Sequence, residues 1–231
     1  MEVYYENLIT VMAKVDIGIS KVYEEFAKAF SFVMLSNEKM KSLHSKNCFK
    51  NYTFNNPYPI EQDKLYHAGR IYMVNFRTPN LEFAVAMKAH MVSAQGCFKV
   101  LAVELRQYEL KPVTKLLTLT PVVSTVENRC WVKADGIGLL SERLHSNAVK
   151  KAKALDEFFT EPPEFFFERV ELLNEKPIVI PYKNTSILAH KLRLCVKPDS
   201  WAQELAATVL ACGALEKNSL GFGYLIIDKR G

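Results

Sequence analysis

The C-terminal part of the chain places a glycine-flanked polar loop between a helical segment and a short apolar run. Apolar residues at helical spacing lead to Gly213, and a polar stretch follows. The run Tyr224–Ile227 then has the residue types of a β-strand. Glycine adopts positive φ and lets another backbone approach closely, so Gly221 and Gly223 constrain the turn. The sequence therefore predicts a tightly shaped loop that joins the last helix to the last strand.

The residues of this loop suit an anion. Successive N–H groups exposed in a turn form an anion-binding concavity. Lys217 adds a positive charge, and Asn218 and Ser219 add polar side chains. An ordinary helix-to-strand turn would also account for the glycines, so both interpretations stay open on these residues alone. If the loop binds a ligand, a phosphate backbone is the ligand that its chemistry favours.

The composition is that of a globular protein with a modest positive charge. The chain has 231 residues, 49% apolar and 24% charged, which suits one large domain or two small ones. A formal net charge of +5 permits a polyanionic partner without requiring one. Five scattered cysteines form no Cys-x-x-Cys, so we expect free thiols in a reducing cytosol rather than disulfides or zinc. Since neither a signal peptide nor a membrane span is indicated, we expect a cytoplasmic protein without membrane association.

The first half of the chain predicts the element order β-α-β-β-α-β. Alternating or β-branched stretches indicate strands at 3–15, 52–54, 70–76 and 98–105. A helix with one apolar stripe is predicted between the first two strands; the stripe contains Ile19, Val22, Tyr23, Phe26, Phe30 and Val33. Thr78 as a cap and Pro79 at the first position favour a second helix. Its expected buried residues are Leu81, Ala84, Val85 and Met91.

The second half is compatible with the same order, with strand residues to spare. We expect strands at 116–123, paired with 130–132, and at 165–173, 177–180, 187–196 and 224–227, with a turn at Tyr182–Asn184. A helix is predicted over 140–159 with Lys150, Lys151 and Lys153 exposed, and Ser200 with Gln203 indicates a capping box for the last helix. The fold class is therefore α+β, with two tandem ferredoxin-like (RRM-like) domains. We place their boundary near Lys111–Pro112, giving domains 1–111 and 112–231.

Gly213 and the run from Glu216 to Gly223 resemble the C-terminal glycine-rich loop of the CRISPR repeat-processing endoribonucleases of the RAMP superfamily. Eight contiguous residues, Glu-Lys-Asn-Ser-Leu-Gly-Phe-Gly, match the second half of that loop, whereas Leu215 stands where a second glycine is usual. Thr118–Val122 is similar to the family's Thr-Leu-Ser-Pro-Ile at the start of the second domain. The resemblance implies tandem ferredoxin-like domains and RNA contacts in the loop at Gly213, Lys217, Asn218, Ser219, Gly221 and Gly223. Looser candidates for RNA contacts are Lys183, Lys191, Arg193 and Arg70.

His44 is the histidine with the most catalytic potential. Histidine side chains act as general acids or bases near neutral pH, and a lysine can neutralise charge that develops on a phosphorane. Lys50 follows His44 by six residues, but this spacing alone also fits an exposed loop. In the family that the chain resembles, a Leu-His motif with a lysine six residues later follows the first helix. That resemblance implies a catalytic role for His44 and a supporting role for Lys50.

The other candidate catalytic residues are less well matched. Many members of the family use a tyrosine from the first helix, but positions 27–30 contain none, and Tyr23 is the nearest. His67 is an alternative second histidine. For His90 and His145 we expect surface or capping roles, and for His190 a strand-surface position. Cys48 lies near His44, but two ligands alone do not make a metal site.

The resemblance implies cleavage of repeat RNA by its own 2′-OH, which gives a 2′,3′-cyclic phosphate and a 5′-OH. We expect no metal and no cofactor, since no acidic cluster of the kind that holds magnesium is apparent. A RAMP subunit that binds guide RNA in a CRISPR effector complex without cleaving it is the alternative. A ferredoxin-like metabolic enzyme would leave the loop match unexplained. The expected partner is CRISPR repeat RNA, and further complex subunits or a homodimer stay open.

Overall fold

A computed structural model describes residues 3–36, 40–41 and 49–229, so His44 and Cys48 lie outside the described residues. The chain forms two compact units. The N-terminal unit extends to Glu109 and includes Ser219–Gly221. The C-terminal unit contains Leu110–Asn218 and the residues from Phe222 onward.

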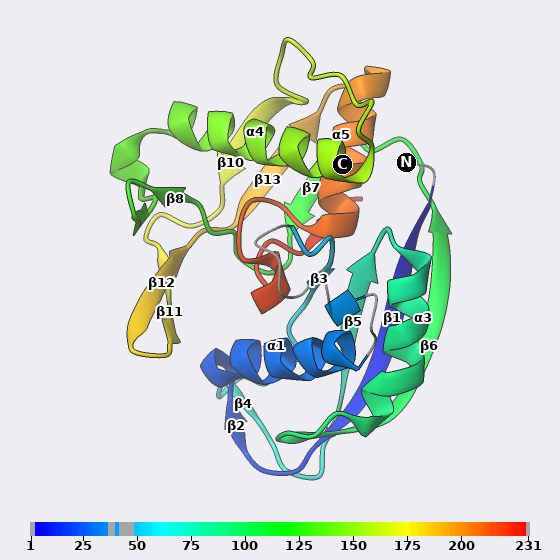
Figure 1. Cartoon of the computed structure of the whole chain (residues 1–231). Coiled ribbons are helices and arrows are strands. Elements are labelled where there is room, and N and C mark those ends of the chain that lie inside the picture. Colours follow the sequence, from blue (N-terminus) through cyan, green and yellow to red (C-terminus); the bar gives the residue numbers. More distant parts are fainter. Residues whose placement is uncertain (1–2, 37–39, 42–48, 230–231) are drawn as a thin grey trace. The chain divides into compact units, whose positions relative to one another are not determined.

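The N-terminal unit has the predicted β-α-β-β-α-β order around one antiparallel sheet. Its strands are β1 (Val3–Ala13), β3 (Thr53–Phe54), β5 (Ile71–Thr78) and β6 (Phe98–Glu109), in the spatial order β3-β5-β1-β6. The helices are α1 (Ile19–Leu35) and α3 (Leu81–His90). A small antiparallel pair, β2 (Ile17–Gly18) with β4 (Leu65–Tyr66), completes the unit (Figure 1).

The core of this unit is built from the apolar stripe of α1 and the inner face of the sheet. The predicted stripe is confirmed, because Val22, Tyr23, Phe26, Phe30 and Val33 are buried. The rings of Phe30 and Phe54 lie 4.7 Å apart, and those of Phe26 and Phe98 lie 5.0 Å apart. Tilted and edge-on aromatic pairs at such distances add to the energy of burial. The cluster therefore fixes short strand β3 against α1.

The start of the second helix differs from the prediction. Asn80, not Thr78, is the N-cap of α3, and its side chain accepts a hydrogen bond from the Phe83 N–H at 2.9 Å. Thr78 is instead the last residue of β5, where its hydroxyl donates to the Asn51 carbonyl. The buried stripe was also predicted wrongly at two positions. Leu81 and Val85 are exposed, and the buried residues of α3 are Phe83, Ala84, Ala86 and Met87.

The C-terminal unit repeats this topology. Its sheet contains β7 (Lys115–Thr118), β10 (Phe167–Leu172), β13 (Leu192–Val196) and β14 (Leu225–Ile227) in the order β10-β13-β7-β14. The helices α4 (Ile137–Leu155) and α5 (Ser200–Cys212) pack side by side (Figure 1). Two hairpins account for the spare strand residues: β8 (Thr125–Val126) with β9 (Arg129–Cys130), and β11 (Ile178–Tyr182) with β12 (Thr185–Ala189). No helix in the described part of the chain is both long and apolar enough to cross a bilayer.

Local predictions for this unit are wrong at Cys130, Ser200 and Lys151. The segment around Cys130 pairs with β8 rather than with β7. Asp199, not Ser200, is the N-cap of α5, and the predicted capping partner Gln203 instead bonds the backbone of Val113 and Lys197. Lys151 is not exposed. It lies inside the unit with 1% of its surface accessible, whereas its neighbour Lys150 is exposed.

Candidate nucleic-acid interface

The glycine-rich loop begins where α5 ends and closes on itself through backbone hydrogen bonds. The Ala214 N–H donates to the Gly223 carbonyl, and the Gly223 N–H donates to the Pro121 carbonyl, both at 2.9 Å. Gly223 has φ of +72°, and a Cβ on it would lie 2.1 Å from the Ala214 carbonyl oxygen. Only glycine therefore fits this position, because any side chain would break the closure of the loop.

A buried ammonium group lies beneath the loop. Lys151 Nζ, from α4, donates to the carbonyl oxygens of Gly213 at 2.6 Å and Leu215 at 2.8 Å. It also donates to the side-chain oxygen of Asn218 at 2.6 Å. Burial lowers the pKa of Lys151 to about 7, although the nearby Cys212 and Glu216 act in the opposite direction. The first half of the loop is thus wrapped around one cation.

The side chain of Asn218 is committed to the shape of the loop. Besides accepting from Lys151, it donates to the carbonyl oxygens of Ala214 and Phe222, both at 2.9 Å, and only 9% of the residue is exposed. The Glu216 carboxylate is also held, because it accepts from the N–H and the hydroxyl of Thr125. Of the polar residues predicted to contact RNA in this part of the loop, Lys217 is the one that is exposed.

The tip of the loop, Ser219–Gly221, belongs to the N-terminal unit and packs on β3. The side chain of Ser219 shares a hydrogen bond with the Tyr52 hydroxyl, whose pKa is raised by burial. Gly221 has φ of +89°, and a Cβ on it would lie 2.7 Å from the ring of Phe54. The loop tip therefore lies against the strand residues that follow Lys50 in the chain.

Lys50 leads directly into this strand. It is half-buried, and the next residue, Asn51, has positive φ of 51°. The Asn51 carbonyl is held by the Thr78 hydroxyl at 2.8 Å, which anchors the turn between Lys50 and β3. The structure thus places the predicted supporting lysine at the entrance to the strand that the loop tip contacts. Its predicted partner, His44, lies outside the described residues.

Tyr23 lies in the interior of the N-terminal unit. Its hydroxyl accepts a hydrogen bond from the Asn56 side chain at 3.2 Å, and 4% of the residue is exposed. Burial raises the pKa of Tyr23, which makes the phenolate harder to form. A tyrosine in this setting has the surroundings of a core residue rather than those of a general base.

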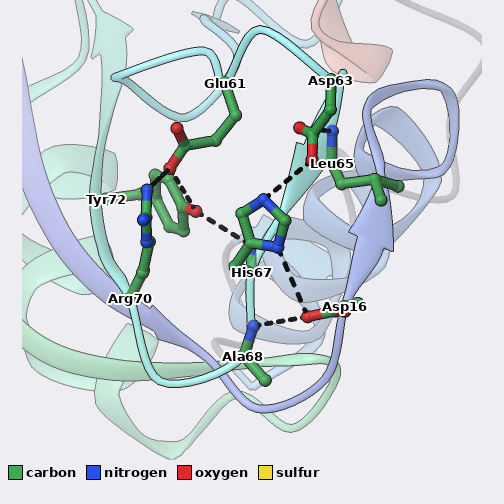
Figure 2. A network of polar contacts seen from close by, with 8 residues as sticks. All are labelled: Asp16, Glu61, Asp63, Leu65, His67, Ala68, Arg70 and Tyr72. Atoms are coloured by element: carbon green, nitrogen blue, oxygen red, sulfur yellow. Dashed lines mark hydrogen bonds and ion pairs between the residues drawn. The ribbon is translucent and has the colours of Figure 1, made fainter.

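His67 lies between two carboxylates. Its Nε2 is 3.0 Å from a carboxylate oxygen of Asp63, and its Nδ1 is 3.9 Å from Asp16 (Figure 2). Asp16 also accepts a hydrogen bond from the Ala68 N–H at 2.8 Å. These contacts connect the segment after β1 to the segment after β4. His67 is therefore part of a polar network that joins two loops of the N-terminal unit.

Arg70 belongs to the same network. Its guanidinium pairs with Glu61 at 2.8 Å, and the Tyr72 hydroxyl donates to the same carboxylate at 3.0 Å (Figure 2). The Arg70 hydrogen bond lowers the pKa of Glu61. The Tyr72 hydroxyl in turn accepts from the His67 N–H at 2.9 Å. Arg70 keeps 63% of its side chain exposed, so a phosphate can still reach it.

The remaining basic candidates differ in their surroundings. Lys183 is exposed at the turn of the β11–β12 hairpin, with its Nζ 5.5 Å from the Tyr182 ring centroid. Arg193, on β13, pairs with Glu171 at 3.0 Å and Asp228 at 3.1 Å. Lys191 is half-buried just before that strand. Lys183 is therefore better placed than Arg193 to meet a phosphate.

Two other histidines are more buried than expected. His190 is 3% exposed, and its ring lies 4.9 Å from the Trp131 ring; the predicted strand-surface position is wrong. His145 is also buried, 5.5 Å from the Phe165 ring, so its predicted surface or capping role is wrong. Burial lowers the pKa of both imidazoles. Over the described residues, no three histidine, cysteine or carboxylate side chains are grouped as a metal site requires.

Sequence reasoning missed Lys151, although the sequence contains a signal for its burial. Leu140, Leu144 and Ala148 are buried on α4 and recur every four residues. Lys151 continues this face three residues later. A lysine on the buried side of an amphipathic helix requires oxygen partners for its ammonium, and the loop supplies them.

The whole chain is similar to CRISPR-associated proteins. No protein-family model matches it. A curated relative, the CRISPR-associated endoribonuclease Cas6 2 of Methanocaldococcus jannaschii, is 25% identical over 239 residues, which is 94% of this chain and 97% of the relative. The resemblance to the CRISPR repeat-processing endoribonucleases is thereby confirmed.

Solved structures confirm the fold. A CRISPR-associated protein Cas6 has a TM-score of 0.71 at 19% identity, covering 98% of this chain and all of that one. A RAMP protein described as binding different RNA substrates has a TM-score of 0.73 at 18% identity, covering 97% of this chain and 100% of its own. A Cas6-related protein of Pyrococcus furiosus has a TM-score of 0.68 at 18% identity, covering 100% and 99%. The tandem ferredoxin-like architecture is therefore shared along the full chain.

Proposed function

We propose that this chain is an endoribonuclease that cleaves CRISPR repeat RNA without using a metal ion. The similarity to a curated endoribonuclease extends over 94% of the chain. The observation that supports the proposal most is the position of the glycine-rich loop tip. Gly221 packs on Phe54, and the side chain of Ser219 forms a hydrogen bond with Tyr52. Tyr52 lies two residues after Lys50 in the chain. A phosphate held at the loop tip would thus be close to the segment that carries Lys50.

The reaction uses a nucleophile that the RNA itself supplies. The 2′-oxygen attacks the adjacent phosphorus, and the bond from phosphorus to the 5′-oxygen breaks. The 2′-OH loses its proton and the leaving 5′-oxygen gains one, so the products carry a 2′,3′-cyclic phosphate and a 5′-OH. Holding the ribose and phosphate in line is the main task of the protein, because the nucleophile is already tethered.

In this proposal, proton transfer and the stabilisation of negative charge are the tasks of His44 and Lys50. His44 transfers a proton, either from the 2′-OH or to the 5′-oxygen. Lys50 stabilises the negative charge that accumulates on the phosphorane oxygens. Tyr23 takes no part, because its hydroxyl is buried and its pKa is raised.

RNA binding depends mainly on phosphate contacts. Neutralising backbone phosphates with lysine or arginine dominates the affinity of most nucleic-acid binders. Lys217 and Lys183 are exposed, and Arg70 keeps most of its side chain accessible despite its pairing with Glu61. We assign these three residues to the RNA backbone, together with Ser219 at the loop tip. Lys191 and Arg193 contribute less, because Lys191 is half-buried and Arg193 is already paired.

A non-cleaving RNA-binding subunit of a CRISPR effector complex is the second candidate. The burial of Tyr23 favours this second candidate, because α1 then offers no catalytic tyrosine to assist His44. A structural neighbour is also described as binding different RNA substrates. This candidate predicts tight RNA binding without any cleavage.

The deciding experiment incubates purified protein with end-labelled repeat RNA in buffer that contains EDTA. Wild type is compared with His44→Ala, Lys50→Ala and the control Lys41→Ala, a lysine exposed at the protein surface. A second RNA carries a 2′-deoxy substitution at the scissile nucleotide. Cleavage that survives EDTA and is lost in His44→Ala and with the deoxy RNA is the expected result. Binding without cleavage would support the second candidate, and cleavage that persists in His44→Ala would overturn the assignment of His44.

A further inference from the structure

The ammonium of Lys151 bonds the glycine-rich loop from the interior of the C-terminal unit. Lys151 is fully enclosed, and its ammonium donates to three oxygens that come from three residues of the loop. Two of these oxygens belong to peptide groups, so the ammonium fixes the backbone orientation at Gly213 and Leu215. The third belongs to Asn218, whose amide group then bonds the carbonyls of Ala214 and Phe222. One cation therefore organises both sides of the loop.

We propose that Lys151 is a positioning residue for RNA binding, because its buried ammonium holds residues 213–223 in the shape that accepts the RNA backbone. This inference rests on the proposed function, in which the loop binds repeat RNA. Lys151 does not contact the RNA itself. It acts through the backbone on either side of Lys217, whose φ of 59° is one that side chains rarely adopt.

The charge matters as well as the bulk of the side chain. An ammonium has three N–H donors, which match the three oxygens that surround it. A neutral amine has only two donors, and its lone pair would face one of the oxygens. A methionine of similar length would leave all three oxygens without this donor, at a cost comparable to other buried unsatisfied groups. The loop is therefore expected to loosen whenever the positive charge is lost.

Loss of the charge falls within an accessible pH range. Burial lowers the pKa of Lys151 to about 7, while the Glu216 carboxylate in the loop favours the charged form. The Cys212 thiol on α5 is neutral in this range, because burial raises its own pKa. Bound phosphates would favour the ammonium further, since linkage is reciprocal. RNA affinity should thus decrease as the pH rises through neutrality, more steeply than screening of surface charges alone would give.

The test measures binding of repeat RNA that carries a 2′-deoxy substitution at the scissile nucleotide and therefore stays intact. Wild type is compared with Lys151→Met, Lys151→Arg and the control Lys150→Met, which removes an exposed charge from the same helix. We expect Lys151→Met to weaken binding about tenfold below neutral pH and Lys150→Met to change it by about twofold or less. Lys151→Arg should retain more affinity than Lys151→Met. Its affinity should also respond less to pH than that of wild type, because arginine stays charged.

A second measurement separates this inference from the proposed function. Hydrogen exchange of the amides in 213–223, recorded without RNA, should accelerate in Lys151→Met and not in Lys150→Met. If wild type does not bind RNA, the proposed function fails, and hydrogen exchange alone decides the role of Lys151. Equal RNA affinity of wild type and Lys151→Met overturns the inference while leaving the proposed function intact. If Lys151→Met does not fold, RNA affinity is measured against pH in wild type and Lys150→Met instead. RNA affinity that does not change with pH in these two proteins overturns the inference.

Discussion

The side-chain oxygen of Asn218 in the loop lies 2.6 Å from Nζ of Lys151 on α4, although the sequence suggested that both side chains would be exposed. Asn218 was predicted to contact RNA, and Lys151 was predicted to be exposed. In the structure the two side chains are hydrogen-bonded to each other and to the loop backbone. The residues left to meet a ligand are Lys217 and, at the loop tip, Ser219.

Gly223→Ala should destabilise the protein strongly. A Cβ at this position would lie 2.1 Å from the Ala214 oxygen, and φ is +72°. We expect a loss of about 2–4 kcal/mol in the free energy of unfolding, measured by urea denaturation. Gly138→Ala is the matched control, because Gly138 lies in α4 with nothing within 4 Å of an added Cβ. That control should stabilise the protein by up to about 1 kcal/mol, and similar effects of the two substitutions would contradict the prediction.

Lys217→Ala should weaken RNA binding at every sequence tested and make it less sensitive to salt. Each phosphate contact contributes about one unit to the slope of log affinity against log salt concentration, so that slope should decrease by about one. The comparison is a salt titration of repeat RNA binding, with the exposed Lys150→Ala as control. An unchanged slope in Lys217→Ala would mean that the loop does not contact a phosphate there.

His67→Ala should leave RNA cleavage within about twofold of wild type. The imidazole pairs with Asp63 and faces Asp16, so its loss removes a partly exposed interaction worth about 1 kcal/mol or less of stability. Single-turnover cleavage and thermal unfolding would measure the two effects. Asp63→Asn, which weakens the same pair, should resemble His67→Ala in both assays. Abolished cleavage in His67→Ala alone would instead identify His67 as catalytic.

The stability of the protein should increase with pH above neutrality because of Lys151. Its pKa in the folded protein is about 7, below the ordinary lysine value of 10.5, so between these values the unfolded chain binds more protons than the folded one. The free energy of unfolding then rises with pH, by at most about 1.4 kcal/mol per unit from this group. The rise should be missing in Lys151→Met and present in Lys150→Met, when unfolding in urea is followed across this range. Parallel curves for wild type and Lys151→Met would contradict the prediction.

The fold could be predicted from the sequence because its signals are local. The stripe from Val22 to Val33 and the alternation in β1 and β5 follow directly from helix and strand periodicity. The buried positions of Lys151 and His190 could not be predicted in the same way. A lysine or histidine is buried only where distant residues supply partners or packing, as Gly213 does for Lys151.

The capping errors have a related cause. Thr78 and Ser200 both have residue types that cap helices, and each lies within two residues of the one that occupies the cap. Thr78 is instead used by β5 and by the turn at Asn51, a contact between residues 27 positions apart. The sequence pointed to the glycine-rich loop and to Lys50 before β3 as parts of the candidate site. It did not point to Lys151, whose ammonium bonds the loop.

Because Lys151 is buried, the protonation state that favours folding differs from the one that favours RNA binding. Neutralising this amine should favour the folded chain over the unfolded one, yet the charged form is the one that fits the three oxygens of the loop. Raising the pH above neutrality should therefore make the chain harder to unfold while it loosens the loop. The pH at which the protein is most stable should lie above the pH at which it binds RNA most tightly.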